Sequence, residues 1–227
     1  MEKTTLEEAK KNKYYEFFIS SNLPLAFIAA ELKDYDTSWL GQGEHGGDNL
    51  RNFQLYLNYI NNIGWQIEHG MGLFLAGSFG VGKTMLEVIA MKKTIDYYLT
   101  RPLSEKDINP SFSIGYLTGA ELVELYAFGD EDKKLSRRSK LKTIDVLAID
   151  ELTRVPLTGT NKEKVLVEEV IRSRAFALKT TIITSQANAE QTGRDMSLAL
   201  PELIREYFVD INFIGPSWRE HYGGKKI

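Results

Sequence analysis

A glycine-rich stretch that ends in a lysine and a threonine is the part of this sequence best suited to chemistry. Gly77 is followed by four residues and then by Gly82-Lys83-Thr84, directly after an apolar run of strand length. Glycines leave backbone N–H groups open to phosphate oxygens, and the start of the following helix adds positive potential. The lysine would reach the terminal phosphates, and the threonine hydroxyl would ligate Mg²⁺. The spacing and its strand–loop–helix context therefore predict a nucleoside triphosphate site rather than a plain strand-to-helix turn. The residues expected to bind the nucleotide are Gly77, Ser78, Phe79, Gly80, Val81, Gly82, Lys83, Thr84 and Met85.

Two carboxylates follow a second apolar run. Residues 144–149 have the pattern of a buried parallel strand, and Asp150 and Glu151 stand at its end. An acidic pair in isolation could be only a helix cap or a turn, but downstream of a phosphate-binding loop it matches a Walker B motif. We expect Asp150 to hold Mg²⁺ together with Thr84, and Glu151 to orient and deprotonate the attacking water. Lys83 and Glu151 are thus candidate catalytic residues of an ATPase that uses ATP and Mg²⁺.

Composition narrows the class of protein. The chain has 227 residues, 26% of them charged and 43% hydrophobic, which suits one globular domain with a small appendage. It has no cysteine, which excludes disulfides and cysteine-ligated metal sites. The net charge of −3 means that any nucleic-acid contact must come from a local patch. No apolar run reaches membrane-spanning length and the first residues are charged, so we expect a cytoplasmic protein without membrane contact.

The chemistry-bearing residues need a scaffold of alternating strands and helices. Apolar strands that alternate with helices indicate a parallel sheet covered on both faces. The expected strands are 72–76, 112–117, 145–149, 181–185 and 209–213. The expected helices are 4–20, one spanning residues 50–60, 83–99, 119–127, 161–178 and 199–208. The glycine-rich residues 41–47 are the best boundary candidate. They divide the chain into an N-terminal helical extension, 1–40, as a candidate partner-binding segment, and a nucleotide-binding domain, 41–227.

Several segments outside the generic motifs resemble the AAA+ ATPases of the DnaC/DnaI helicase-loader group, which also contains the IstB transposition ATPases. The similarity lies in the lead-in at residues 23–27 and 32–36, the strand at 180–186, and the ending at 203–205 and 213–219. It covers about residues 23–220. It implies an α/β fold, a P-loop NTPase of the AAA+ type with a parallel sheet sandwiched by helices. The segment before Gly41 suits only a short N-terminal helical extension, and little room follows Arg219, so we expect little or no C-terminal lid.

The resemblance also implies roles for polar residues near the ends of the later strands. Arg205 resembles an arginine finger that a neighbouring subunit would supply to stabilise γ-phosphate charge. Arg219 resembles a sensor arginine on the nucleotide phosphates. Thr184 and Gln186 are the sensor candidates, although the group usually has asparagine where Gln186 stands. Arg174 matches another arginine typical of the group and is expected to contact a neighbouring subunit or DNA.

A basic segment suggests contact with single-stranded DNA. Six cations fall within residues 133–142, shortly after two aromatic residues. Cations can track phosphates while aromatic rings stack on bases. The alternative is an amphipathic helix with a solvated basic face, which is what charge runs usually mean. In the helicase-loader group this region carries an insertion that touches single-stranded DNA. The DNA-binding candidates are Tyr126, Phe128, Lys133, Lys134, Arg137 and Arg138.

The resemblance therefore implies an ATP-dependent loader that binds a hexameric replicative helicase and single-stranded DNA. Its subunits would associate through an ATP-bound interface, and hydrolysis would drive release. Two alternatives stay open on the sequence. One is an IstB-like transposition helper that acts on duplex DNA. The other is an ATP-gated binding adaptor in which hydrolysis is incidental.

Overall fold

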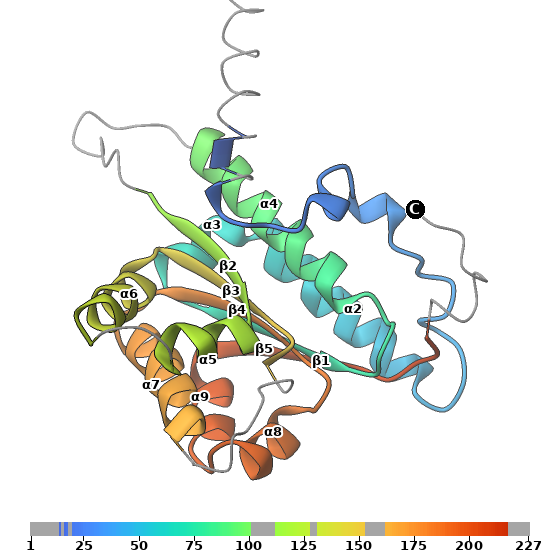
Figure 1. The fold of residues 1–227 in the computed structure, drawn as a ribbon. Helices are drawn as coiled ribbons and strands as arrows, with labels where there is room; N and C mark the ends of the chain where they lie inside the picture. Colours follow the sequence, from blue (N-terminus) through green and yellow to red (C-terminus); the bar gives the residue numbers. More distant parts are fainter. Residues whose placement is uncertain are drawn as a thin grey trace, which may run out of the picture.

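The described part of the chain is built around one parallel β-sheet. The computed structural model describes residues 14, 16–17, 20–100, 112–127, 131–152 and 162–217. Within these residues the sheet has five strands in the order β2-β3-β4-β1-β5, and every neighbouring pair is parallel (Figure 1). The strands are β1 (Gly72–Gly77), β2 (Ile114–Thr118), β3 (Val146–Asp150), β4 (Thr180–Ser185) and β5 (Phe208–Phe213).

Strand register brings the carboxyl ends of the strands to one edge of the sheet. Thr118 of β2 pairs with Asp150 of β3, and Ala76 of β1 pairs with Ser185 of β4. Gly77, at the end of β1, pairs with Phe213 at the end of β5. The glycine-rich loop after β1 and the acidic pair after β3 therefore emerge at the same edge, with β4 between their strands.

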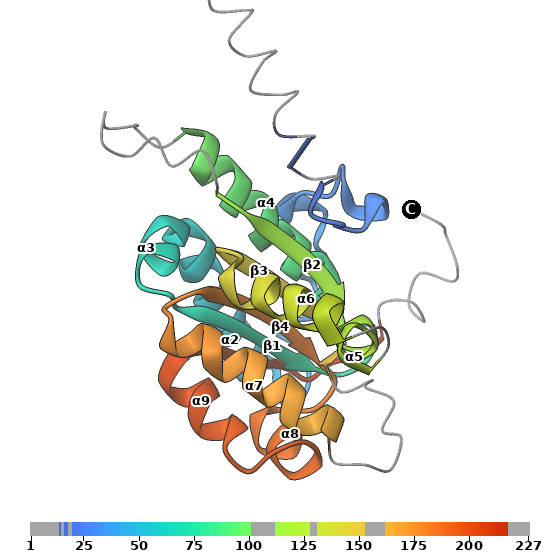
Figure 2. The ribbon, with the colours of Figure 1, turned by 60° about the vertical axis from the view of Figure 1, so that its left-hand side comes forward.

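Helices cover both faces of the sheet (Figures 1 and 2). One face carries α2 (Gly46–Asn61), α3 (Ile63–Glu68) and α4 (Lys83–Thr100). The other side carries α5 (Gly119–Ala127), α6 (Glu131–Thr143), α7 (Lys162–Phe176), α8 (Ala189–Asp195) and α9 (Leu200–Tyr207). The strands divide the buried apolar side chains into two clusters, one under each helical layer. This three-layer arrangement explains why the strands β1, β3 and β4 are buried along their whole length.

The lead-in before α2 packs onto the sheet domain. It contains two short 3₁₀ turns, Leu25–Phe27 and Leu32–Asp34, and its residues Leu23, Tyr35 and Trp39 are buried in the cluster that includes α2 and α4. The Lys92 ammonium of α4 donates to the backbone carbonyl oxygens of Ile28 at 3.0 Å and Ala30 at 2.6 Å. The division of the chain at residues 40 and 41 stays a prediction, and residues 21–40 share the core of the sheet domain.

The expected parallel α/β sandwich is confirmed, and each expected strand is present within about two residues of its boundaries. The helices α3 and α8 were not predicted, and α6 was expected only as the alternative interpretation of the basic segment. Of the expected helix 4–20, residues 14, 16, 17 and 20 are described, and they are helical. Up to residue 217, no helical lid follows β5. Among the described helices, none combines the length and apolar character that spanning a membrane requires.

Candidate nucleotide-binding site

The glycine-rich loop has a backbone shape that only glycine allows. Gly80 and Gly82 adopt φ values of 82° and 88°, in the left-handed region that side chains disfavour. A Cβ atom at Gly80 would lie 2.3 Å from Oγ of Ser217, and one at Gly82 would lie 2.7 Å from Cε2 of Tyr35. The loop is therefore tightly enclosed by residues far away in sequence. Of the other expected nucleotide-binding residues, Val81 is buried, Ser78 and Met85 are half-buried, and Phe79 is exposed.

Tyr35 fixes this loop from the lead-in side, a role that the sequence did not reveal. Its hydroxyl donates to the Val81 carbonyl oxygen at 2.8 Å, and its ring stacks on Phe53 with 5.5 Å between centroids. Burial raises the pKa of Tyr35, so the hydroxyl stays a neutral donor at physiological pH. Tyr35 thus holds the loop through Val81, and Ser217 lies close against Gly80.

The Lys83 ammonium lies inside the loop at the start of α4. It donates to the carbonyl oxygens of Gly77 at 2.8 Å and Ser78 at 2.9 Å. Burial lowers the pKa of Lys83 to about 8, while the charges of Asp150 and Glu151 act in the opposite direction. Phosphate oxygens are stronger acceptors for an ammonium than neutral carbonyl oxygens. The lysine can therefore exchange these loop partners for the phosphates of a bound nucleotide.

Asp150 gathers three hydroxyl groups from three different elements. Oγ1 of Thr84 lies 3.2 Å from both carboxylate oxygens, and the Tyr116 hydroxyl donates to Oδ2 at 2.8 Å. The Thr184 hydroxyl donates to Oδ1. A hydroxyl and a carboxylate are the hard oxygen ligands that Mg²⁺ prefers. The arrangement therefore brings together the two residues expected to ligate the metal, and it adds Tyr116, which the sequence did not single out.

Glu151 follows with an unusual backbone conformation. Its φ is 54°, uncommon for a residue with a side chain, and its N–H donates to Oγ1 of Thr184 at 2.8 Å. The Thr184 hydroxyl thus accepts from Glu151 and donates to Asp150, so it sets the orientation of both acidic residues. Gln186, the other expected sensor, is exposed just beyond the end of β4.

A second buried carboxyl group lies close to this cluster. Glu87 is one helical turn after Lys83 and fully buried, and neither of its carboxyl oxygens has a hydrogen-bond partner among the described residues. Burial, followed by the charge of Asp150, raises the pKa of Glu87 well above its usual range. Burial and then the charge of Glu87 raise the pKa of Tyr116. Burial therefore favours the protonated, neutral form of the Glu87 carboxyl group.

Arg205 lies apart from the nucleotide-binding loop. It is in the last turn of α9, which packs on α7, α8 and β5, and its side chain is 53% exposed. Its guanidinium pairs with the carboxylates of Glu190 and Glu202. The structure does not bring it to Lys83 or Thr84 within one subunit. Arg219 lies outside the described residues.

Arg174 is not available for a neighbouring subunit or for DNA, and that interpretation of the sequence is wrong. Its side chain is fully buried. The guanidinium donates to the carbonyl oxygens of Leu141, Ile144 and Thr180, each at 2.7 Å, and to Oγ1 of Thr181 at 2.9 Å. Burial lowers the pKa of Arg174 to about 9, and the charge of Asp145 opposes this shift. The residue instead ties the carboxyl end of α6 to β4.

The basic segment forms α6, which presents several of its cations to solvent. Arg137 is exposed and Arg138 is half-buried. Lys142 is engaged in an ion pair with Glu169 at 2.6 Å. The DNA-binding candidates whose side chains lie outside the described part of the structure are Tyr126, Phe128, Lys133 and Lys134.

Comparison with known proteins supports the fold that these elements build. No protein-family model matches the sequence, and no curated protein is similar to it in sequence. The crystal structure of DnaI matches with a TM-score of 0.60 at 19% identity, covering 86% of this chain and 94% of that chain. The DnaC helicase loader matches with a TM-score of 0.60 at 20% identity, over 85% and 100% of the two chains. The chain has the fold of DnaI and of the DnaC helicase loader.

A replication initiator also has a similar fold, at lower sequence identity. DnaA bound to AMPPCP and single-stranded DNA matches with a TM-score of 0.54 at 15% identity, covering 80% of this chain and 51% of that chain. The likeness thus spans about half of that DnaA chain. The AAA+ type of P-loop NTPase fold expected from the sequence is confirmed.

Proposed function

We propose that this protein is an ATP-dependent loader of a replicative helicase. The meeting of Thr84, Asp150 and Glu151 beside the glycine-rich loop is the observation that carries the ATPase part of the proposal. Two residues with metal-ligand chemistry and one candidate base lie next to a loop suited to phosphates. The DnaI/DnaC fold supports the loader part, because the DnaC of known structure is a helicase loader.

In this proposal each residue of the site has one task. Backbone N–H groups of the loop and the Lys83 ammonium bind the β- and γ-phosphates of ATP. Thr84 and Asp150 would hold Mg²⁺, which neutralises phosphate charge when bound. Glu151 orients a water molecule for in-line attack and accepts its proton. Thr184 keeps Asp150 and Glu151 in place through its two hydrogen bonds.

Hydrolysis then depends on association of subunits. Arg205 is exposed and remote from Lys83 in sequence and in packing, which suits a finger that acts on the site of a neighbouring subunit. A finger of this kind can raise the rate of hydrolysis by about 10³- to 10⁵-fold. Specific activity should therefore rise with protein concentration, and Arg205→Ala should bind ATP normally while losing this rise. Concentration-independent activity in clearly monomeric protein would sink the trans assignment.

The ATPase assignment is tested with two substitutions and a control. Lys83→Ala should abolish ATP binding, because it removes the phosphate-binding cation. Glu151→Gln should bind ATP without turning it over. Lys93→Ala changes an exposed lysine of the same helix and should leave binding and hydrolysis unchanged. Wild-type ATP affinity in Lys83→Ala, measured by titration calorimetry, would contradict the site.

The client and the DNA substrate need a separate measurement. We propose that the protein binds single-stranded DNA through α6 and the residues before it, and that residues 1–40 contribute to binding a hexameric helicase. The protein of residues 1–227 and a variant lacking residues 1–20 would be tested for retention of a purified hexameric replicative helicase. Anisotropy with labelled oligonucleotides would compare single-stranded with duplex DNA. Absence of helicase retention together with a duplex preference would favour the transposition-helper alternative.

A further inference from the structure

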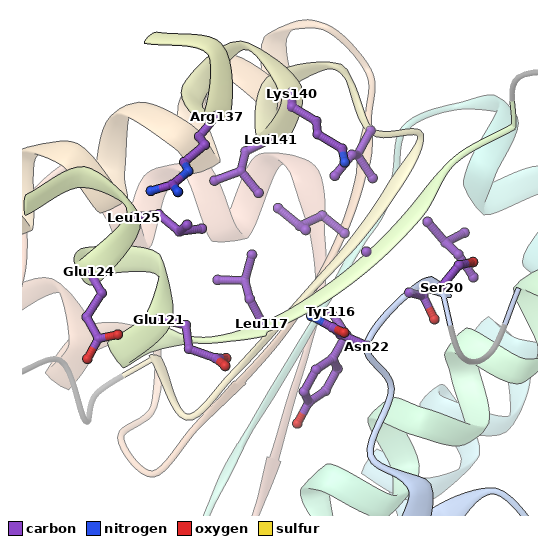
Figure 3. Close-up of a pocket in the computed structure, with 15 residues that line it drawn as sticks. Ser20, Asn22, Tyr116, Leu117, Glu121, Glu124, Leu125, Arg137, Lys140 and Leu141 are labelled. Carbon is purple, nitrogen blue, oxygen red and sulfur yellow. The ribbon is translucent and has the colours of Figure 1, made fainter. Parts of the chain in front are cut away.

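A cavity lies on the sheet face that α5 and α6 cover, at the edge strand β2. Its volume is about 560 Å³, within the range of small-molecule sites. Figure 3 shows Leu117 on β2, Arg137 and Lys140 on α6, and Glu124 on α5 among the residues that line it. None of its lining residues belongs to the glycine-rich loop, and one of them, Tyr116, also donates to Asp150 of the candidate nucleotide-binding site.

A glycine in the edge strand is among the residues that line this cavity. Gly115 has no positive φ, so its backbone does not require glycine. A Cβ atom there would lie 3.1 Å from Cδ1 of Ile144 and 3.3 Å from Cδ1 of Leu147. A larger side chain would therefore occupy the floor. Glycine inside a strand often marks a place where a ligand or another backbone approaches closely.

The rim of the cavity carries charged groups that are free to bind a ligand. Glu121 is engaged, because its Oε2 accepts from the N–H of Thr118 at 2.7 Å and from its hydroxyl at 2.9 Å. In contrast, Glu124, Arg137 and Lys140 form no side-chain hydrogen bond or ion pair with other described residues. Two cations and one carboxylate thus surround an apolar floor without being paired to each other.

We propose that this cavity takes one nucleobase of a bound single strand and favours guanine over thymine. The inference rests on the proposed binding of single-stranded DNA along α6. Arg137 belongs to that basic segment and can bind the phosphate beside the base. The ring of the base packs on the apolar floor. The carboxylate of Glu124 accepts hydrogen bonds from the edge of the base.

The chemistry of the carboxylate sets the preference. An ionised carboxylate only accepts hydrogen bonds, and its two oxygens match two neighbouring donors. Guanine presents such a pair, N1–H and the N2 amino group. Thymine has one N–H group between two carbonyl oxygens, which a carboxylate repels. A good bidentate contact is worth about tenfold in affinity, near the lower end of measured base discrimination.

The test compares two labelled strands of about 16 nucleotides, a length that suits single-strand binding sites. One strand is all thymidine, and the other carries a single central guanosine. Fluorescence anisotropy should show the intact protein binding the guanosine strand about tenfold more tightly. In Glu124→Gln this ratio should fall towards one. Glu44→Gln removes the same charge from an exposed residue outside the cavity and should keep the ratio.

A second variant tests the floor independently of charge. Gly115→Ala narrows the cavity and should weaken binding of the guanosine strand more than that of the thymidine strand. Equal affinity of the intact protein for both strands would overturn the base pocket while leaving DNA binding intact. An affinity ratio between the two strands that is unchanged in Glu124→Gln would also overturn the base pocket. Failure of both strands to bind at low salt would overturn the proposed DNA binding and the pocket together.

Discussion

Removing the buried guanidinium of Arg174 should strongly destabilise the protein. The group makes four hydrogen bonds, three of them to carbonyl oxygens. Hydrogen bonds from a charged donor contribute about 1.5 kcal/mol or more each, so the four would amount to roughly 6 kcal/mol. The desolvation of the guanidinium offsets part of this sum. Arg174→Met, which keeps most of the volume, should therefore lower the free energy of unfolding by about 3–5 kcal/mol.

Another arginine of α7 provides a matched control. Arg172 lies on the same helix and pairs with Glu168, but its side chain is 39% exposed. Partly exposed pairs of this kind contribute about 0–1 kcal/mol, so Arg172→Met should have a small effect. Urea unfolding followed by circular dichroism would measure both variants. Losses of similar size in the two variants, each below about 1 kcal/mol, would refute the account of Arg174.

Two further expectations concern buried ionisable groups beside the nucleotide site. Burial raises the pKa of Glu87 in the folded state, so the contribution of this group to stability should fall as pH rises above the unfolded value of 4.5. Glu87→Gln should remove this loss. As pH rises, the free energy of unfolding of the wild type, measured by urea unfolding, should therefore fall relative to that of Glu87→Gln by at most about 1.4 kcal/mol per pH unit. Equal pH profiles of the two proteins would contradict this account of Glu87. Burial lowers the pKa of Lys83 to about 8, and phosphates favour its charged form, so ATP affinity should fall above that pH, by up to about tenfold per unit. A Kd for ATP that stays constant from about pH 7 to about pH 9.5 would argue against a functional role for this shift.

The meeting of the glycine-rich loop and the acidic pair was predictable because the signals of both motifs are local. The residues from Gly77 to Thr84 are contiguous, and Asp150 and Glu151 follow directly from a buried strand. Since parallel strands end at one edge, the sequence also implied that the two motifs meet. The contact between Thr84 and Asp150 follows from these rules without knowledge of individual side-chain positions.

The supporting residues were not predictable in the same way, because each is isolated in sequence. Tyr35, Tyr116 and Ser217 acquire their roles only through tertiary packing. Glu87 did carry a signal, since it interrupts an apolar run on α4 and is flanked by Leu86 and Val88. A charge at such a position indicates a buried ionisable group.

Helical periodicity would have corrected the interpretation of Arg174. It lies three, four and seven residues after Ile171, Val170 and Val167, which are fully buried. Residues at these spacings share one helix face, so the arginine had to point into the core. The missed helix α8 likewise had a cap signal, because Asn188 accepts from the N–H of Gln191 at 2.9 Å. Gly193 inside this short helix lowers its intrinsic propensity and concealed it.

The contact between Tyr35 and the glycine-rich loop has a thermodynamic consequence for signalling. Because Tyr35 donates to Val81 and its ring closes on Gly82, the lead-in and the loop cannot be displaced independently. If a ligand of the lead-in changes the affinity of the loop for a second ligand, the second ligand changes the affinity of the lead-in for the first by the same free energy. A ligand that acts on the Tyr35 contact from the lead-in would therefore change the affinity of the loop for the proposed nucleotide, and the nucleotide would change the affinity for that ligand in equal measure.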